Sequence, residues 1–154
     1  MRAYFVNRRL AFGSAITTWK HVERLQALGN THVINLRRNR HGKKVKSFKN
    51  LWLPFWDDKK PRPRWFYKQS RSFFEKAMRE PNAKVFVMCH FGICRSASLT
   101  YFLLRLSGKG PNKSKALVLK ARPCAVFGRG YIESTEGYLG HHRTGRKKSH
   151  TRSY

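Results

Sequence analysis

The sequence is poor in acidic residues and contains no long apolar run. Its 154 residues include seven Asp and Glu against 34 Lys and Arg, a formal net charge of +27. Such a charge attracts polyanions, whether RNA, DNA, anionic lipid or a phosphorylated partner, but it does not specify a fold. No apolar run approaches the roughly 20 residues of a membrane-spanning helix, and no secretory signal is recognisable. We therefore expect no transmembrane segment and an intracellular, cytoplasmic protein, or a nuclear one in a eukaryote.

Cysteine is also scarce, because the chain has only Cys89, Cys94 and Cys124. Such a small, odd number argues against a disulfide framework. No CxxC pair is present, and the His pair at 141–142 lacks companions at zinc spacing, so no metal site or cofactor is predicted. With 40% hydrophobic residues, the chain can still bury a conventional core in one domain. Nothing in the sequence indicates the oligomeric state.

Apolar periodicity predicts helices alternating with strands. Helices are predicted over 17–28, 64–80, 96–108 and about 113–121, and strands over 31–36, from 51 onward and over 84–88. One packed face is predicted for the first helix from apolar residues at three-residue steps, Trp19, Val22, Leu25 and Leu28. Residues 130–139 fit neither pattern clearly. The alternation predicts a single-domain α/β fold with a central, mostly parallel twisted sheet and helices on both faces.

Two segments are strongly basic. Residues 37–49 contain seven Lys and Arg and no acid, which predicts an exposed loop or short hairpin. The polar, basic residues from 141 onward are typical of a disordered tail. We therefore expect a domain over 1–140 and a basic tail over 141–154. Proteins that bind single strands place aromatic side chains where nucleic-acid bases can stack between them. Here the aromatic residues mostly fit core patterns, so a dedicated RNA-binding fold is not favoured.

The junction between strand 84–88 and helix 96–108 has the features of an anion site. A tight turn entering a helix leaves several backbone N–H groups unpaired, and the helix dipole adds positive potential. Gly92 in mid-turn allows a positive φ, and Arg95 offers a planar pair of donors for phosphate. The predicted phosphate-binding loop comprises His90, Phe91, Gly92, Ile93, Cys94 and Arg95.

Cys89 lies at the start of this loop, where positive potential favours a thiolate over a thiol. A thiolate beneath a bound phosphate is a nucleophile aimed at phosphorus, and the Ser96 hydroxyl can stabilise it when it leaves. Alternatively, Cys89 and Cys94 are small core residues, as free cysteines often are. The spacing of Cys, five residues, Arg and Ser between buried elements favours the catalytic interpretation.

The sequence CHFGICRS resembles the Cys-x5-Arg-Ser/Thr signature loop of cysteine-dependent phosphatases, most closely the dual-specificity branch. Residues 9–36 are similar to that family's opening strand, helix and second strand, and LPFWD resembles the segment that carries its general acid. The likeness covers roughly residues 8–140. Low-molecular-weight phosphatases, arsenate reductases and rhodanese-like proteins share the signature alone, but the candidate acid here, Asp57, precedes the cysteine by 32 residues. That order, and the fold it implies, are those of the dual-specificity and tyrosine phosphatases.

The resemblance implies a metal-independent mechanism through a phosphocysteine. Cys89 attacks phosphorus, Arg95 holds the phosphate, and Asp57 protonates the leaving oxygen before activating water. Asp58 is the rival acid, and we prefer Asp57 for its LPFxD context. The family usually has His before the nucleophile, whereas this chain has Met88, so the stabilisation of the thiolate is an open question.

The resemblance implies proteins phosphorylated on tyrosine, serine or threonine as substrates. The positive charge also suits an RNA 5′-phosphatase or a phosphoinositide phosphatase, and Met88 is compatible with a catalytically weak phosphate-binding module. If strands 31–36 and 84–88 are parallel, Arg37 and Arg38 emerge at the same edge as the phosphate loop and are candidate substrate-facing residues. The alternative is a basic loop that is simply solvated. RNA or another polyanion is therefore a candidate partner, beside a phosphorylated protein substrate.

Overall fold

The computed structural model describes the backbone of residues 1–146 and the side chains of residues 1–140. Its strands are β1 (Ala3–Phe5), β2 (Leu10–Gly13), β3 (His32–Asn35), β4 (Lys49–Trp52) and β5 (Val85–Met88). Its helices are α1 (Trp19–Ala27), α2 (Gly42–Val45), α3 (Arg64–Met78), α4 (Arg95–Leu106), α5 (Pro111–Ala121) and α6 (Arg129–Arg146).

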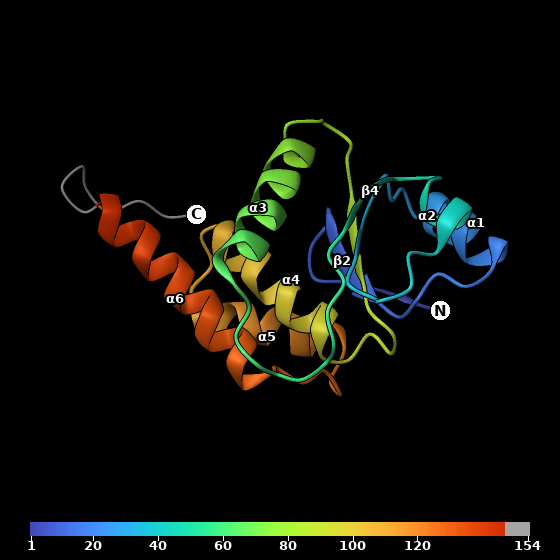
Figure 1. The fold of residues 1–154 in the computed structure, drawn as a ribbon. Coiled ribbons are helices and arrows are strands. Elements are labelled where there is room, and N and C mark those ends of the chain that lie inside the picture. The colour runs from blue at the N-terminus through green and yellow to red at the C-terminus, as the bar shows by residue number, and fades with distance from the viewer. Residues whose placement is uncertain (147–154) are drawn as a thin grey trace.

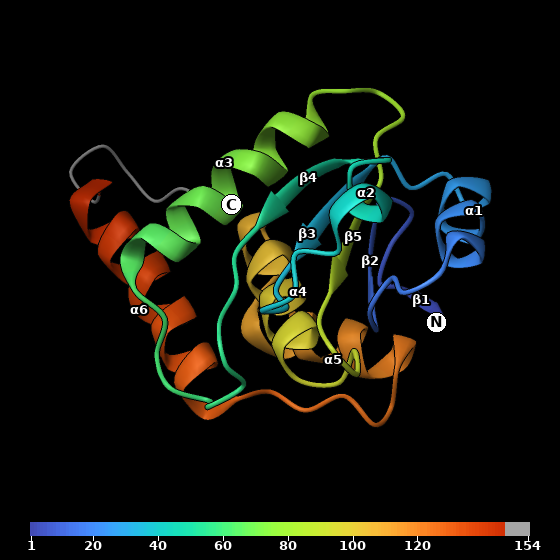
Figure 2. The ribbon, with the colours of Figure 1, turned by 45° about the vertical axis from the view of Figure 1, so that its right-hand side comes forward.

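The strands form one sheet in the order β1-β2-β5-β3-β4. Strands β2, β5, β3 and β4 are parallel, and they lie side by side in Figure 2. The register aligns their last residues, because Met88 pairs with both Gly13 and Asn35, and Asn35 pairs with Trp52. The chain therefore leaves all four strands along one edge of the sheet, where ligands of such folds bind.

Helices cover both faces of the sheet. Helices α3, α4, α5 and α6 lie on one side, and α1 and α2 lie on the other (Figure 1). Strand β5 shows the alternation this requires, since Val85 and Val87 belong to the larger core cluster and Phe86 and Met88 to the smaller one. All four side chains are buried, as expected for a central parallel strand. The predicted mostly parallel sheet with helices on both faces is confirmed.

The antiparallel edge strand β1 was not predicted. It pairs with β2 through a tight connection, with Tyr4 opposite Phe12. The strand has only three residues, all partly buried. It is therefore too short to show either a long apolar run or an alternation of apolar and polar residues. A short edge strand of this kind gives little sequence signal.

The predicted packed face of α1 is only half right. Val22 and Leu25 are buried, whereas Trp19 and Leu28 are 52% and 42% exposed. Residues three apart are separated by about 300° around a helix, so a run of three-residue steps drifts by about 60° each time. The two central residues therefore face the sheet, and the two outer ones turn away from it.

The basic segment 37–49 is more ordered than the predicted loop or hairpin. It contains the short helix α2, and its last residue begins β4. Val45 and Phe48 are buried in the smaller cluster and anchor the segment. His41 precedes the helix with a φ of 62°, a left-handed conformation. Two apolar residues three positions apart thus hold an otherwise basic segment against the sheet.

The ambiguous residues 130–139 lie within α6, which runs from Arg129 to Arg146. Its backbone continues beyond the predicted domain end at residue 140. Residues 147–154 lie outside the described residues, so the boundary and the tail remain predictions. No helix in the described part of the chain is long and apolar enough to cross a membrane.

Candidate active site

Residues 89–95 curl between the end of β5 and the start of α4. Gly92 has a φ of 68°, in the left-handed region that favours glycine. A Cβ atom at this position would also collide with the backbone of Gly13 and Ser14 at the end of β2. Glycine is therefore required both for the turn and for its close packing against the neighbouring strand.

The peptide groups of this loop are hydrogen-bonded in only one sense. Every carbonyl of residues 90–94 accepts a hydrogen bond from the surrounding protein, the donors being Ala15 N, Arg122 Nη1 (twice), Val126 N and Ser98 N. None of the N–H groups of residues 90–95 has an acceptor among the described residues. The carbonyls are thus tied to the scaffold, while six successive donors are left for water or a ligand.

Helix α4 extends this arrangement of donors. Its N-cap residue, Cys94, makes no side-chain capping hydrogen bond, so the first turn also offers unpaired N–H groups. The helix dipole adds to the positive potential there. Such a loop suits an oxyanion better than a cation, and no cluster of three His, Cys, Asp or Glu able to hold a metal ion is present in the described part of the chain.

Cys89 is 3% exposed, and its thiol donates to the buried Ser96 hydroxyl at 3.2 Å. Its backbone N–H donates to Gly13 O at 3.2 Å, which fixes the start of the loop against β2. The structure thus brings together Cys89 and Ser96, which the sequence separates by seven positions. If the thiol lost its proton, the hydroxyl could donate to the sulfur in turn.

Arg95 is held between the chain segments that follow β3 and β4. Its Nη1 donates to Leu36 O at 3.2 Å and to Phe55 O at 2.8 Å. Because these hydrogen bonds use Nη1, the Nε and Nη2 groups remain available as a planar pair of donors. The two carbonyls therefore fix the guanidinium without consuming the donors that would bind phosphate.

Asp57 lies beside the loop, on the segment that follows β4. Its Oδ1 accepts a hydrogen bond from the Tyr131 hydroxyl at 3.1 Å and lies 3.6 Å from Lys59 Nζ. Burial, and next the charge of the Asp57 carboxylate, raise the pKa of the Cys94 thiol to about 11, so the carboxylate borders the loop. Asp58 instead accepts from Lys60 N within its own segment, at 2.9 Å. The geometry thus favours Asp57 over Asp58.

The start of α6 holds the Asp57 segment in place, a role that the sequence did not reveal. Tyr131 accepts from Lys59 N at 2.8 Å, and Gly130 N donates to Lys59 O at 2.9 Å. A Cβ atom at Gly130 would collide with the backbone of Lys59 and Lys60. Burial, with a further contribution from Asp57, raises the pKa of the Tyr131 hydroxyl, which therefore stays protonated as a donor.

Arg122, at the end of α5, is a second residue that sequence reasoning missed. Its Nη1 donates to Phe91 O at 2.9 Å and to Gly92 O at 2.7 Å, and its guanidinium lies 4.6 Å from the ring centroid of Tyr4 on β1. The unpredicted edge strand thus supports the side chain that orients the middle of the loop. No local motif around Arg122 indicates this contact.

The parallel pairing of β3 and β5 brings Arg37 and Arg38 to the loop edge, as the sequence predicted for that pairing. Burial, followed by the charge of Arg95, lowers the pKa of Arg37, and the Cys89 sulfur acts in the opposite direction. Arg37 is therefore an electrostatic neighbour of both groups. The Arg38 guanidinium instead lies over the Trp56 ring, 4.3 Å from its centroid.

Met88 is fully buried in the smaller apolar cluster, on the face covered by α1 and α2. Cys89 belongs to the larger cluster on the opposite face. The residue before the cysteine therefore directs an apolar side chain away from the loop and supplies no hydrogen bond to it.

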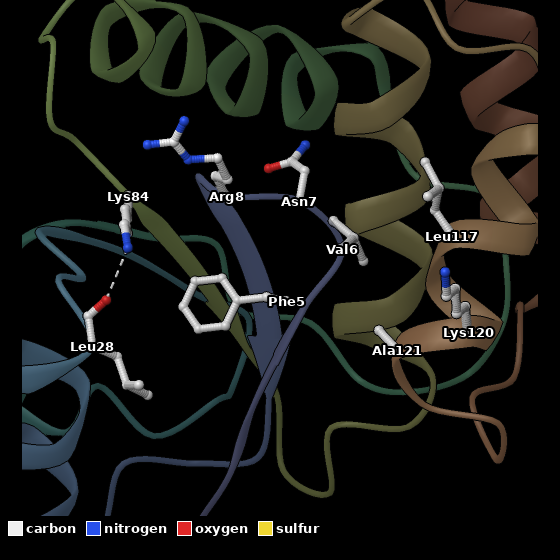
Figure 3. A pocket seen from close by; sticks show the side chains of 9 residues that line it. All are labelled: Phe5, Val6, Asn7, Arg8, Leu28, Lys84, Leu117, Lys120 and Ala121. Carbon is white, nitrogen blue, oxygen red and sulfur yellow. Dashed lines mark hydrogen bonds between the residues drawn. The ribbon is translucent and has the colours of Figure 1, made fainter.

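A cavity of about 660 Å³ lies elsewhere, between the β1–β2 connection and α5 (Figure 3). Its lining includes Phe5, Lys84 and Lys120, and Lys84 Nζ donates to Leu28 O at 3.1 Å. Lys84 directly precedes β5 and Cys89 directly follows it, so the five residue steps between them span roughly 16 Å. The cavity is therefore distinct from the Cys89 loop.

The fold is shared with several solved phosphatase structures. Human DUSP28 superposes with a TM-score of 0.76 at 23% identity, covering 91% of this chain and 97% of that one. Tk-PTP in its active form gives 0.76 at 20% identity, with coverages of 90% and 96%. PTPMT1 in complex with PI(5)P gives 0.78 at 16% identity, with coverages of 94% and 98%. At these identities the similarity establishes the fold alone.

The family model for the dual specificity phosphatase catalytic domain matches residues 12–134. The chain therefore belongs to this family, and it is a phosphatase, that is, a phosphoric monoester hydrolase. No curated protein matches it in sequence.

Replacing Arg122 tests the support of the loop. We expect Arg122→Ala to weaken inhibition by inorganic phosphate roughly tenfold, because two charged hydrogen bonds that hold the loop carbonyls are lost. The inhibition constant measured during hydrolysis of p-nitrophenyl phosphate reports the effect. Arg129→Ala is the control, since it removes an equal charge from a side chain that is 92% exposed. An equal loss in both variants would show that net charge alone matters.

Proposed function

We propose that the chain hydrolyses phosphomonoesters through a phosphocysteine formed at Cys89. The observation that carries this proposal is the orientation of the loop: every carbonyl of residues 90–94 accepts a hydrogen bond from the protein, and no N–H of residues 90–95 has an acceptor among the described residues. A thiol at the start of such a loop lies where a bound phosphate would present its phosphorus atom. Family membership supports the same chemistry.

In the first step, the Cys89 thiolate attacks phosphorus in line with the leaving oxygen. The unpaired N–H groups and the free donors of Arg95 hold the equatorial oxygens, whose charge they stabilise in the transition state. The S–P bond forms as the P–O bond breaks. Asp57 gives its proton to the departing oxygen, because an alkoxide or phenoxide is a poor leaving group.

In the second step, water attacks the phosphocysteine and Asp57, now ionised, accepts its proton. The S–P bond breaks, inorganic phosphate is released, and Cys89 departs as a thiolate. The Ser96 hydroxyl lies 3.2 Å from that sulfur, and it would donate a hydrogen bond to the thiolate in place of accepting one from the thiol. Tyr131 holds Asp57 through its hydroxyl and acts as a positioning residue in both steps.

We propose phosphotyrosine, phosphoserine and phosphothreonine side chains of proteins among the substrates, which the family description supports. The catalytic domain in this proposal comprises residues 1–140, followed by the basic tail 141–154. Phosphoinositides are a further candidate class, because the structurally similar PTPMT1 has been solved in complex with PI(5)P. Inositol phosphates and RNA ends also carry the phosphomonoester group that the loop would hold.

Replacing the nucleophile tests the mechanism. We expect Cys89→Ser to reduce hydrolysis of p-nitrophenyl phosphate to the uncatalysed background, because a serine hydroxyl is not ionised near neutral pH. Cys124→Ser, at an exposed cysteine, should retain activity. Under reducing conditions vanadate should inhibit the wild type and EDTA should leave its rate unchanged. A rate that disappears with EDTA would contradict this mechanism.

The two neighbouring acids can be separated by the leaving group. We expect Asp57→Ala to lower kcat by about 10²- to 10⁴-fold on phenyl phosphate, and by less on p-nitrophenyl phosphate, whose leaving group needs less protonation. Asp58→Ala should change neither rate more than a few fold. The reverse pattern would reassign the general acid to Asp58.

Tyr131→Phe tests whether α6 positions the acid. Removal of one hydroxyl that donates to Asp57 should lower kcat on phenyl phosphate roughly tenfold and leave KM unchanged, because the phosphate loop is untouched. The loss should shrink on p-nitrophenyl phosphate, a pattern that general destabilisation would not produce. Equal losses on both substrates would refute the positioning role.

A further inference from the structure

The tryptophans lie on the surface, although the sequence placed most aromatic residues, Trp19 among them, in core patterns. Trp19, Trp52, Trp56 and Trp65 are 52%, 36%, 66% and 54% exposed. Large aromatic side chains normally bury most of their surface, so their joint exposure requires an explanation. Most phenylalanine and tyrosine side chains fit the expected core pattern, and a dedicated RNA-binding fold stays disfavoured, but these four tryptophans leave aromatic rings at the surface.

Two of these rings, with the arginines beside them, form one surface next to the active site. We define the tryptophan rim as Arg37, Arg38, Arg40, Trp52 and Trp56. Arg38 lies over the Trp56 ring at 4.3 Å from its centroid, and Arg40 over the Trp52 ring at 5.1 Å. The Trp52 indole N–H donates to Arg37 O at 2.8 Å, which ties β4 to the segment that follows β3. Each ring thus has a guanidinium against one side.

The rim borders the catalytic groups. Arg95 Nη1 donates at 3.2 and 2.8 Å to the carbonyls of the residues directly before Arg37 and Trp56, and Trp56 directly precedes Asp57. Within the phosphate loop itself, Phe91 is 67% exposed and packs against His90, with 4.2 Å between ring centroids. Exposed aromatic rings therefore belong to both the acid segment and the phosphate loop.

The charges of this region are not neutralised within the protein. No carboxylate lies within ion-pair distance of the six Lys and Arg between residues 37 and 46, as far as the structure describes the chain. The nearest basic residue in sequence that is paired, Lys49, contacts Glu80. A surface with several unpaired cations attracts a ligand that carries several negative charges.

Cations alternating with exposed aromatic rings fit a single-stranded nucleic acid better than the other polyanions. A strand supplies both a phosphate at each step and bases that stack on aromatic rings, whereas a phosphopeptide supplies no regular series of charges. A lipid surface is typically bound by the apolar face of an amphipathic helix, whereas Trp52 ends a strand and Trp56 lies in the connection after it. Within the rim, only arginine accompanies the rings, and one indole N–H is already bonded to the protein.

We propose that the tryptophan rim binds a single-stranded nucleic acid, and that a strand with a 5′-terminal phosphate is a further substrate of the Cys89 site. This inference rests on the proposed function. The terminal phosphate occupies the loop, the first bases stack on Trp56 and Trp52, and the following phosphates contact Arg38 and Arg40. Transfer of the phosphoryl group to Cys89 releases a 5′-hydroxyl strand that takes its proton from Asp57, and water then frees inorganic phosphate.

Binding is measured first, in a Cys89→Ser background that cannot turn over substrate. Fluorescence anisotropy with a labelled ten-nucleotide strand compares 5′-phosphate and 5′-hydroxyl ends, in RNA and in DNA. We expect tighter binding of the 5′-phosphate strand, weakened roughly 5- to 150-fold by Trp56→Ala, the range that corresponds to loss of one stacked base. The affinity should also fall steeply as salt rises.

The matched control is Phe5→Ala. Phe5 has a cation over its ring, Lys84 at 5.6 Å, but it lines the cavity at the opposite end of β5 (Figure 3). This variant should bind the strand like its parent. In the active background, Trp56→Ala should lower kcat/KM for the 5′-phosphorylated strand at least fivefold more than it lowers kcat/KM for p-nitrophenyl phosphate, because any disturbance of the neighbouring Asp57 affects both substrates.

The outcomes separate the two proposals. Hydrolysis of p-nitrophenyl phosphate without preference for a 5′-phosphate strand, or with no effect of Trp56→Ala, overturns the rim proposal and leaves the phosphatase mechanism intact. Absence of all hydrolysis overturns the mechanism, and the substrate claim with it, while the binding arm still decides whether the rim holds a strand. Trp56-dependent preference for a phosphotyrosyl peptide, or for vesicles containing a phosphoinositide, overturns the rim proposal in favour of that ligand.

Discussion

The orientation of the peptide groups in residues 90–95 is the constraint on which the site depends. A loop whose carbonyls pointed inward would repel an oxyanion, whatever side chains it carried. Here the carbonyls of residues 90–94 accept hydrogen bonds from four residues, Ala15, Ser98, Arg122 and Val126, so the N–H groups, which have no acceptor in the described part of the chain, are left for a ligand. Donors held in this way before the ligand arrives need no reorganisation when it binds. Cys89, the proposed nucleophile, acquires its setting from this backbone more than from any neighbouring side chain.

The fold supplies these donors because the parallel strands end along one edge. The chain leaving β2 contributes Ala15 N, and the chain leaving β3 and β4 contributes the carbonyls that fix Arg95. Two helices complete the site from the opposite end of the sequence, through Arg122 after α5 and Tyr131 at the start of α6. The short strand β1 has a function in this scheme, since Tyr4 packs against Arg122.

The sequence predicted the parts of the site that are contiguous. A strand, a loop and a helix that follow one another leave a local pattern, and Cys89, Gly92, Arg95 and Ser96 lie within it. Tyr131 and Arg122 reach the site from 74 and 30 positions away, and neither belongs to a motif, so only the folded chain reveals them. Trp19 was misplaced for a related reason. Helical spacing identifies one apolar face but does not show which residues at its margin turn towards solvent, as Trp19 does.

Met88 marks where this chain departs from its family, and the structure limits what that departure changes. Its side chain packs on the face of the sheet covered by α1 and α2, whereas Cys89 belongs to the opposite cluster. The groups that can stabilise a thiolate here are the loop N–H groups, Arg95 and Ser96, and none of them contacts residue 88 through its side chain. An imidazole directed to the same face as Met88 would not contact the Cys89 sulfur. It would influence the thiolate only indirectly, through the loop backbone and through its electrostatic potential. Its replacement by a thioether would therefore alter the environment of the proposed nucleophile and leave the outward-tied carbonyls and unpaired donors of the loop as they are.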